Sequence, residues 1–247
     1  KAYGKTTDLT AMGGAQYVHT FDKCFFMPSD LTAGLEYNRD RLKDNMWGYN
    51  RHTDQTVNIY SAFLQNEWKN DRWGILIGGR LDKHNMVDNV IFSPRANLRF
   101  NPTQNINLRL SYSSGFRAPQ AFDEDMHIEN VGGTVAMIER AKDLKEEKSQ
   151  SFSVSADMYH RFGAFQTNLL IEGFYTRLTD VFVLGKPYDR GDGILVKTRS
   201  NGPGAKVMGL TLEGKVAYLS ILQIQAGLTL QRSRYDVPPC SSLLHWR

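Results

Sequence analysis

The sequence lacks the features that mark several large classes of protein. No run among its 247 residues approaches the roughly 18 uninterrupted apolar residues that a membrane-spanning helix needs, which excludes a helical membrane protein. Its two cysteines, Cys24 and Cys240, lie near opposite ends of the chain and show no C-x-x-C spacing. We therefore expect no zinc or redox site, and two unpaired thiols.

A strong excess of charge of one sign is also missing. The formal net charge is +4, and lysine and arginine are spread among aspartate and glutamate rather than gathered into a stripe. Proteins that bind nucleic acids carry such a basic stripe or patch. Because the sequence has neither this stripe nor an aromatic-plus-basic RNA motif, we expect no nucleic-acid partner.

Neither end of the sequence resembles a complete terminus. A secreted protein needs a signal peptide, and none precedes Lys1. The last eight residues, 240–247, fit no strand pattern. We therefore expect a chain that is cut at both ends, with a non-native or disordered tail over residues 236–247.

Apolar and polar residues alternate with a period of two along most of the chain, which is typical of strands with two different faces. The alternation is clearest in residues 31–37, 73–81, 95–100, 106–113, 151–158 and 222–230, and weaker in 15–21, 56–68, 165–181 and 207–217. These segments predict about ten strands, many near the ~9–11 residues with which a tilted strand crosses a bilayer.

The predicted connections alternate between short and long. Tight turns are expected at residues 69–72, 102–105, 161–164 and 218–221, and long segments at 42–55, 83–93, 115–148 and 184–205. The connection at 22–30 is intermediate and falls on the short side. Outer-membrane barrels have this asymmetry, with short periplasmic turns and long extracellular loops.

Aromatic residues gather beside the short turns, where they would form an interfacial girdle. They are Phe21, Trp68, Trp73, Phe100, Phe162, Phe165 and Tyr218. Together with the alternation and the loop pattern, they predict an all-β fold: part of an antiparallel up-and-down transmembrane β-barrel.

The two faces of the predicted strands suit different solvents. The apolar faces would join into a wide surface that water tolerates poorly, so we expect them to contact outer-membrane lipid. The polar face carries large hydrogen-bonding side chains that suit a wet lumen. The candidate lumen-facing residues are Arg95, Asn97, Arg99, Asn107 and Arg109.

Two neighbouring strands resemble a known family. Residues 93–100 read SPRANLRF, and residues 105–119 read NINLRLSYSSGFRAP. Both are similar to barrel strands of TonB-dependent receptors. Shorter likenesses are GGRLD at residues 78–82 and VMGLTLEG at 207–214, where Thr211 stands in place of the family's usual Glu.

The resemblance extends over about residues 30–235 and implies a bacterial outer-membrane receptor. Barrels of this family have ~22 strands around a plugged lumen, so ten strands would be less than half of one. The plug domain and the C-terminal strands are absent from residues 1–247. The implied function is uptake of a scarce small-molecule nutrient, a ferric siderophore first and a corrinoid such as cobalamin second. The TonB complex is an implied partner, acting through the missing N-terminal region.

The longest predicted loop holds the densest group of ligand-type side chains. Carboxylates and a histidine can bind a cation, but their spacing matches neither an EF-hand nor a zinc site. A solvated acidic loop is the simpler interpretation, and we predict no metal, cofactor or catalytic residue. The candidate ligand-facing residues in this loop are Arg117, Asp123, Glu124, Asp125, His127 and Glu129.

Two other functions stay open. Ten strands could close into a small outer-membrane barrel that acts as a passive porin or carries an enzyme at its rim. Polar loop residues that such an enzyme would need are present without a local catalytic signature. They are His52, Asp54, His84, Asn85 and Asp88. The other alternative is a soluble β-sheet binding module, which would not depend on detergent after purification.

Overall fold

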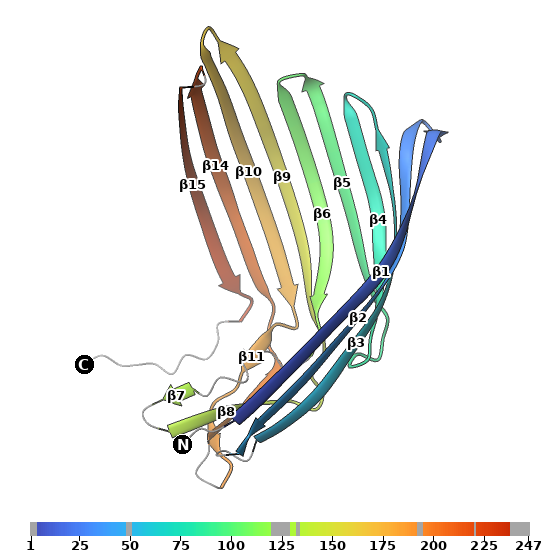
Figure 1. Cartoon of the computed structure of the whole chain (residues 1–247). Coiled ribbons are helices and arrows are strands. Elements are labelled where there is room, and N and C mark those ends of the chain that lie inside the picture. Colours follow the sequence, from blue (N-terminus) through green and yellow to red (C-terminus); the bar gives the residue numbers. More distant parts are fainter. Residues whose placement is uncertain are drawn as a thin grey trace, which may run out of the picture.

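A single antiparallel sheet of ten long, curved strands dominates the protein (Figure 1). The computed structural model describes residues 4–47, 51–119, 129–131, 134–191, 195–219 and 221–237. In their order across the sheet the strands are β1 (Gly4–Cys24), β2 (Met27–Met46), β3 (Arg51–Lys69), β4 (Trp73–His84), β5 (Ile91–Thr103), β6 (Ile106–Arg117), β9 (Glu147–Phe162), β10 (Phe165–Thr179), β14 (Ala205–Tyr218) and β15 (Leu222–Tyr235). The predicted partial barrel is confirmed, with β1 and β15 as the edges of the described sheet.

The strand register gives the sheet one continuous apolar face. Residues directly opposite each other on paired strands point to the same side of a sheet. One apolar row therefore crosses six strands, from β5 to β15. It contains Leu98, Leu110, Val154, Gly173, Leu210 and Leu230. The side chains of this face are exposed, as Val154 at 58% and Leu110 at 51% illustrate.

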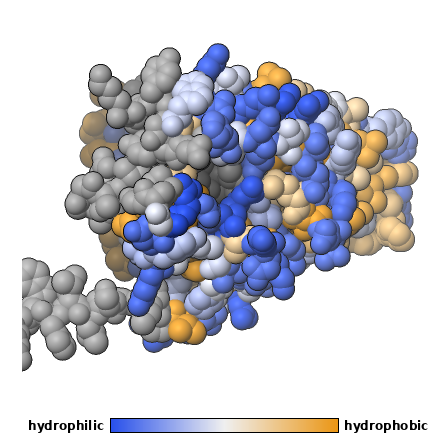
Figure 2. All heavy atoms as spheres, turned by 90° about the horizontal axis from the view of Figure 1, so that it is seen from below, coloured by the Kyte–Doolittle hydropathy of each residue, from blue (hydrophilic) through white to orange (hydrophobic). Residues whose placement is uncertain are grey.

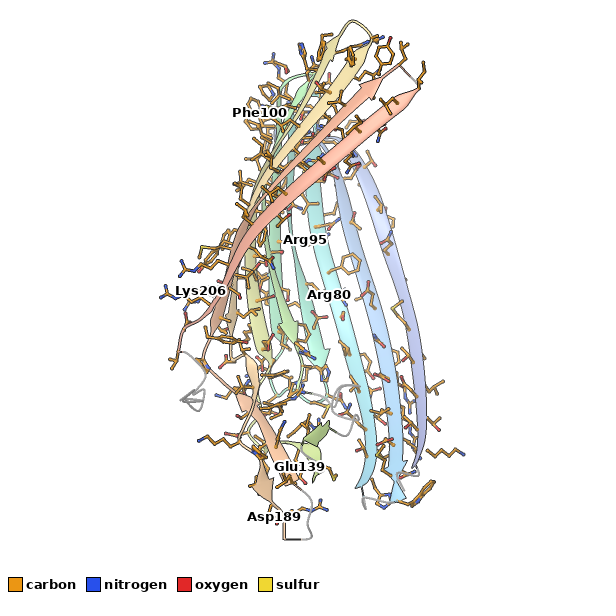
Figure 3. The ribbon with its side chains drawn as sticks, turned by 90° about the vertical axis from the view of Figure 1, so that its left-hand side faces the viewer. Arg80, Arg95, Phe100, Glu139, Asp189 and Lys206 are labelled. Carbon is orange, nitrogen blue, oxygen red and sulfur yellow. The ribbon has the colours of Figure 1, made fainter. Side chains whose placement is uncertain are left out.

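The opposite face is the inner, concave side of the curved sheet and is polar. Its side chains are more crowded, and Ser61 and Asp82 are buried there at 6% and 2% exposure. Arg80 and Arg95 lie on this inner side of the curved sheet (Figure 3). Seen from the end with the long connections, hydrophilic side chains fill the middle of the molecule and apolar ones lie toward its edges (Figure 2).

With the exception of the connection between β2 and β3, the connections separate by length as the sequence predicts. The five tight turns that follow β1, β3, β5, β9 and β14 share one end of the sheet, and the longer connections share the other (Figure 1). Phe25 makes the first of these turns with a positive φ of 63°. The segment 22–30 is therefore mostly strand with a tight turn, at the end where the short connections were expected.

One predicted long loop is wrong. Residues 42–55 are mostly strand, because β2 and β3 stay paired as far as Met46 and Arg51. This part of the two strands is rich in Asn, Asp, Arg and Lys and has no apolar alternation. A backbone ladder can continue beyond the apolar band that meets lipid, so alternation does not report the full strand length.

Aromatic rings pack against one another at the short-turn end. The rings of Trp73 and Phe100 stack with their centroids 4.2 Å apart, and those of Phe165 and Tyr218 are 4.9 Å apart. Phe26 stacks on Trp68 at 5.8 Å. Such rings at the edge of an apolar band are typical of a membrane interface.

The two longest connections form a second sheet, which the sequence did not predict. Its strands are β7 (Glu129–Val131), β8 (Thr134–Arg140), β11 (Phe182–Leu184), β12 (Tyr188–Asp189) and β13 (Leu195–Asn201). They follow the order β11-β13-β8-β7, and β12 also pairs with β13. The pair β8–β13 is parallel and joins the two connections to each other. We call this five-stranded unit the loop sheet.

Among the described residues no helix is long and apolar enough to cross a membrane. Cys24 is a free, half-buried cysteine, while Cys240 lies outside the described residues.

Two residues of the predicted tail are described. The backbone N–H of Asp236 donates to the carbonyl of Gly204 at 2.8 Å, and its carboxylate pairs with Lys206 at 2.8 Å. This bond to Lys206 lowers the pKa of the Asp236 carboxyl. Residues 238–247 lie outside the described residues, so a disordered tail there stays a prediction.

Candidate functional site

The five candidate lumen-facing residues share one face of the sheet. Arg95 lies opposite Ser113, and Arg99 lies opposite Arg109, across the β5–β6 pair. Asn97 falls between the two arginines of β5 on the same face, and Asn107 precedes Arg109 on β6 in the same way. Their role in a lumen stays a prediction.

Most of these side chains are fixed by hydrogen bonds to the sheet. The Arg99 guanidinium donates to the carbonyl of Asn70 at 3.0 Å. The Arg109 Nε donates to the Asn107 side-chain oxygen at 2.7 Å, and the Asn107 amide donates to Asn101 at 2.6 Å. The inner face beside the short turns is therefore an ordered polar network rather than a set of free side chains.

A charged ladder crosses the inner face of β2, β3 and β4. Arg80 reaches Glu36 on the neighbouring hairpin with an N–O distance of 2.6 Å, and its Nε donates to Asp82 at 2.8 Å. The Ser61 hydroxyl donates to the same carboxylate oxygen of Asp82 at 2.6 Å. A carboxylate as buried as Asp82 needs such partners, because an unpaired buried charge is strongly unfavourable.

This ladder borders a hollow of about 470 Å³ in the inner wall. Arg95 lines the same hollow, together with the ring of Phe63 and the amide of Gln65. Sequence reasoning missed the ladder. Arg80 and Asp82 lie in the GGRLD segment, but their link to Glu36 depends on a register between strands that the sequence does not reveal.

The loop sheet is attached to the end of the ten-stranded sheet through a few specific contacts. The Asn201 amide donates to the carbonyls of Lys145 and Asp180 at 3.0 and 2.8 Å, and its oxygen accepts from the Lys145 N–H at 2.8 Å. Glu147 accepts a hydrogen bond from the backbone N–H of Phe182 at 2.9 Å. One asparagine thus joins residues from both long connections.

The loop sheet also encloses a small core. Val196 is fully buried, and Met137 is 4% exposed. Arg199 is buried on the same strand as Val196, and its carbonyl accepts from the N–H of Ala141 at 2.9 Å. This end of the protein is therefore a folded unit rather than a pair of separate loops.

The structure describes only part of the candidate ligand-facing set. Arg117 ends β6, with its guanidinium carbon 5.8 Å from the ring centroid of Phe182. Glu129 begins β7 and pairs through its backbone with Ala136. Within the described ranges, no group of three or more His, Cys, Asp or Glu side chains could hold a metal ion. Four candidates lie outside the described residues: Asp123, Glu124, Asp125 and His127.

The polar residues considered for a rim enzyme are not brought together. His52 and Asp54 lie on the apolar face of β3, with the His52 ring nitrogen 3.0 Å from the Asn45 side chain. His84 is fully buried on the other face, where its Nδ1 accepts from the N–H of Met86 at 3.0 Å. The Asn85 side chain donates to the carbonyl of Thr56 and so continues the strand pairing.

The geometry agrees with comparisons to known proteins. The family model described as "TonB dependent receptor-like, beta-barrel" matches residues 2–241. The siderophore receptor PirA from Pseudomonas aeruginosa superposes with a TM-score of 0.76 at 17% identity, over 94% of this chain and 44% of that one. The FrpB iron transporter from Neisseria meningitidis gives 0.62 at 16% identity, over 92% and 36%.

Further similarities concern the ferric enterobactin receptor PfeA from Pseudomonas aeruginosa and a protein of Haemophilus influenzae. PfeA superposes with a TM-score of 0.70 at 19% identity, over 93% of this chain and 36% of that one. The Haemophilus protein, "Probable hemoglobin and hemoglobin-haptoglobin-binding protein 3", is 23% identical over 206 residues. The match covers 81% of this chain and 18% of that protein, and the chain spans less than half of each relative named here.

Proposed function

The chain belongs to the TonB-dependent receptor β-barrel family of the bacterial outer membrane, and we propose that it forms part of the wall of a receptor that imports an iron-carrying nutrient. The observation that carries this proposal is the two-faced sheet. Its outer face is apolar over ten strands, which suits lipid, and its inner face is polar and charged, which suits a lumen filled by water and a plug. The family is one of receptors rather than enzymes.

We infer that a ferric siderophore is the first candidate ligand. PirA and PfeA are named as siderophore and ferric enterobactin receptors, FrpB as an iron transporter, and the Haemophilus protein as one that binds hemoglobin. Iron is common to these names, so we place a corrinoid such as cobalamin second. TonB and a plug domain are the expected protein partners.

The inner arginines supply an electrostatic reason for such a ligand. Arg95, Arg99 and Arg109 lie on one face of β5 and β6, so together they would attract anionic groups passing along the wall. Many ferric siderophore complexes are anionic. In this proposal the loop sheet meets the ligand first, and the arginines then favour its passage; no bond of the ligand is made or broken.

The test compares iron and corrinoid uptake in a bacterium that lacks other receptors of this kind. The strain carries the gene for this protein, and energy-dependent uptake of radiolabelled ferric enterobactin and of radiolabelled cobalamin is measured. We expect iron uptake that disappears when the gene is disrupted. Uptake of cobalamin alone, or of neither ligand, would contradict the proposal.

The role of the inner arginines has its own variants. The double substitution Arg95→Gln and Arg109→Gln should lower the initial uptake rate several-fold, because it removes two cations from the wall. The matched control is the double substitution Arg232→Gln and Arg234→Gln on the outer face of β15. If both double variants lowered the uptake rate equally, the position of the arginines on the inner face would be irrelevant to uptake.

A further inference from the structure

The asparagine that attaches the loop sheet is followed directly by a glycine. Asn201-Gly202 is the only Asn-Gly pair in residues 1–247. An asparagine can lose its side-chain nitrogen when the backbone nitrogen of the next residue attacks its side-chain carbonyl carbon. Glycine favours this attack, because it has no Cβ to obstruct it and leaves the backbone free to rotate. A structural contact and a chemically labile pair therefore coincide.

Asn201 supports the attachment of the loop sheet at a strained point. Asp180, whose carbonyl accepts a hydrogen bond from the Asn201 amide, has a positive φ of 55°. This backbone conformation is costly for a residue with a side chain. The same asparagine side chain bonds to the backbone of Lys145 in the other long connection, at 3.0 and 2.8 Å. We call these bonds of Asn201 to Asp180 and Lys145 the joint.

The loss of the amide nitrogen needs no partner other than water. The Gly202 nitrogen gives up its proton and forms a bond to the side-chain carbonyl carbon of Asn201. The bond from that carbon to the side-chain nitrogen breaks, and the nitrogen leaves as ammonia. Water then opens the cyclic imide at one of its two carbonyls, which yields aspartate or isoaspartate. Because the two reacting groups belong to neighbouring residues, the geometry of the chain controls the rate.

The docked loop sheet opposes this reaction. The Gly202 N–H donates to the carbonyl of Val181 at 2.7 Å, so the attacking nitrogen is held elsewhere. The Asn201 side chain is held by the joint, and its backbone is paired within the loop sheet. The attack requires the reacting atoms to align at roughly 3–3.5 Å, so these bonds must break first. Asn201 is only half-buried, so hydrogen bonding rather than exclusion of water protects it.

We propose that Asn201-Gly202 is a deamidation site that reacts when the loop sheet detaches, and that the reaction prevents the loop sheet from docking again. An aspartate side chain donates no hydrogen bond, so the carbonyls of Lys145 and Asp180 lose their donor and face a negative charge instead. Isoaspartate also adds one carbon to the main chain at the end of β13. The site is independent of the imported ligand.

The first test compares the reaction rate in the folded and the unfolded protein. Purified, detergent-solubilised protein is kept in mildly alkaline buffer, with and without guanidinium. Trypsin cuts after Arg199 and Lys206 and releases residues 200–206, whose deamidated fraction is followed by mass spectrometry. We expect the folded protein to react at least about tenfold more slowly, because only molecules with an open joint can react. Equal rates, or no reaction in guanidinium, would overturn the proposal.

A variant that loosens the attachment without changing Asn201 tests the link to docking. Glu147 accepts the hydrogen bond from the Phe182 N–H, so Glu147→Ala should raise the deamidation rate of the folded protein several-fold. The matched control is Glu146→Ala, because Glu146 pairs with Lys148 at 3.1 Å. Equal deamidation rates in the two variants would contradict control of the reaction by the loop sheet. Heat-modifiable gel mobility reports that both variants assemble.

The effect of the product on docking is tested with Asn201→Asp. On intact cells, added protease should cut the long connections several-fold faster in this variant than in the unchanged protein, because the donated bonds of the joint are lost. The matched control is Asn70→Asp, whose side-chain oxygen can still accept from the N–H groups of Arg72 and Trp73. If Asn201→Asp were as resistant to protease as the control, the proposed release of the loop sheet would be wrong.

The attacking atom is tested with Gly202→Ala. A Cβ at this position would lie 2.6 Å from the Val183 side chain in the folded protein, so the rate is compared in guanidinium. There the methyl group should slow deamidation by about tenfold, because it obstructs the backbone nitrogen. A rate equal to that of the unchanged protein would show that the Gly202 nitrogen is not the nucleophile and would overturn the proposed site.

Discussion

The ten-stranded sheet and the loop sheet are built by different rules. In the ten-stranded sheet, each long strand pairs antiparallel with the next long strand in the sequence. In the loop sheet, β8 and β13 come from separate connections and pair in parallel. The large sheet follows from local patterns and short turns, whereas the loop sheet forms only when two distant segments meet.

The two sheets also differ in where their apolar side chains lie. The ten-stranded sheet leaves large apolar residues exposed on its outer face, for example Leu228 at 58% and Leu230 at 62%. The loop sheet encloses Val196 and Met137. We conclude that lipid stabilises the large sheet and that a small buried core stabilises the loop sheet, so substitutions in the two units should have different consequences.

The largest effect is expected from a charge on the lipid-facing side of the large sheet. Val154 points outward between Leu110 and Gly173, and its chain neighbour Ser153 points inward. Val154→Arg should cost up to about 2–4 kcal/mol, because the guanidinium must enter hydrocarbon. Heat-modifiable gel mobility of the outer-membrane fraction should show poor assembly.

The adjacent substitution Ser153→Arg is the control for this prediction. Its arginine would lie on the polar inner face, where water and neighbouring polar groups can solvate it. We expect near-normal assembly. If Ser153→Arg and Val154→Arg assembled equally well, the assignment of the two faces would be wrong.

A smaller effect is expected where a ring covers a glycine on the inner face. A Cβ on Gly34 would clash with the Phe63 ring on the paired strand. Gly34→Ala should therefore destabilise the sheet by about 1–2 kcal/mol, the range for modest overpacking. Resistance to urea, measured in detergent, reports the change.

Two variants check that the clash is the cause. Gly173→Ala places its Cβ 3.7 Å from Val154, an ordinary contact, so we expect little change. Combining Gly34→Ala with Phe63→Ala removes the ring that the new methyl group would meet. If the loss of stability in the double variant equals the sum of the losses in Gly34→Ala and Phe63→Ala, the ring and the glycine are not coupled.

The outcome of sequence-based prediction differs between the two units for a physical reason. Alternation and turn residues are local, so they sufficed to predict ten strands and the outward face of segments such as 106–113 and 151–158. They failed at 42–55, where the paired strands continue without apolar alternation. They also failed for the loop sheet, because its strands are short and pair across a long stretch of sequence.

The candidate site was less predictable than the fold. Period-two alternation predicts that Arg95, Arg99 and Arg109 share one face of the sheet, as they do. Alternation does not predict the charged ladder from Glu36 to Asp82, because the ladder depends on the register of three strands. The acidic segment at 123–127 lies outside the described residues, so its role stays a prediction.

Asn201 tests whether the loop sheet is independent of the large sheet. Asn201→Ala removes two donated hydrogen bonds and one accepted bond that join Lys145 and Asp180. Since water can replace part of these partners, we expect a local loss of about 1–2 kcal/mol. On intact cells, added protease should cut the long connections faster in the variant than in the unchanged protein. The heat-modifiable gel mobility of the barrel should stay normal. Loss of assembly would show that the two sheets fold as one unit.

The smallest effect is expected at the contact between the two sheets. Arg117 ends β6 and lies opposite Glu147, and both side chains contact Phe182 at the start of the loop sheet. Arg117→Gln should loosen this contact by roughly 0.5–1 kcal/mol, because the cation–π interaction is lost, and Arg117→Lys should retain much of it. Protease cutting near Phe182 should therefore be modestly faster in the glutamine variant and close to normal in the lysine variant.

Arg117 is also a candidate ligand-facing residue, and the two roles predict different results. If its main role is to attach the loop sheet, Phe182→Leu should mimic Arg117→Gln in protease cutting, and the double variant should be no worse than either single one. If Arg117 instead meets an anionic ligand, Arg117→Gln should weaken ligand binding while Phe182→Leu leaves it unchanged. Because the guanidinium lies over the Phe182 ring, we expect the first result. Additive effects of the two substitutions on protease cutting would contradict it.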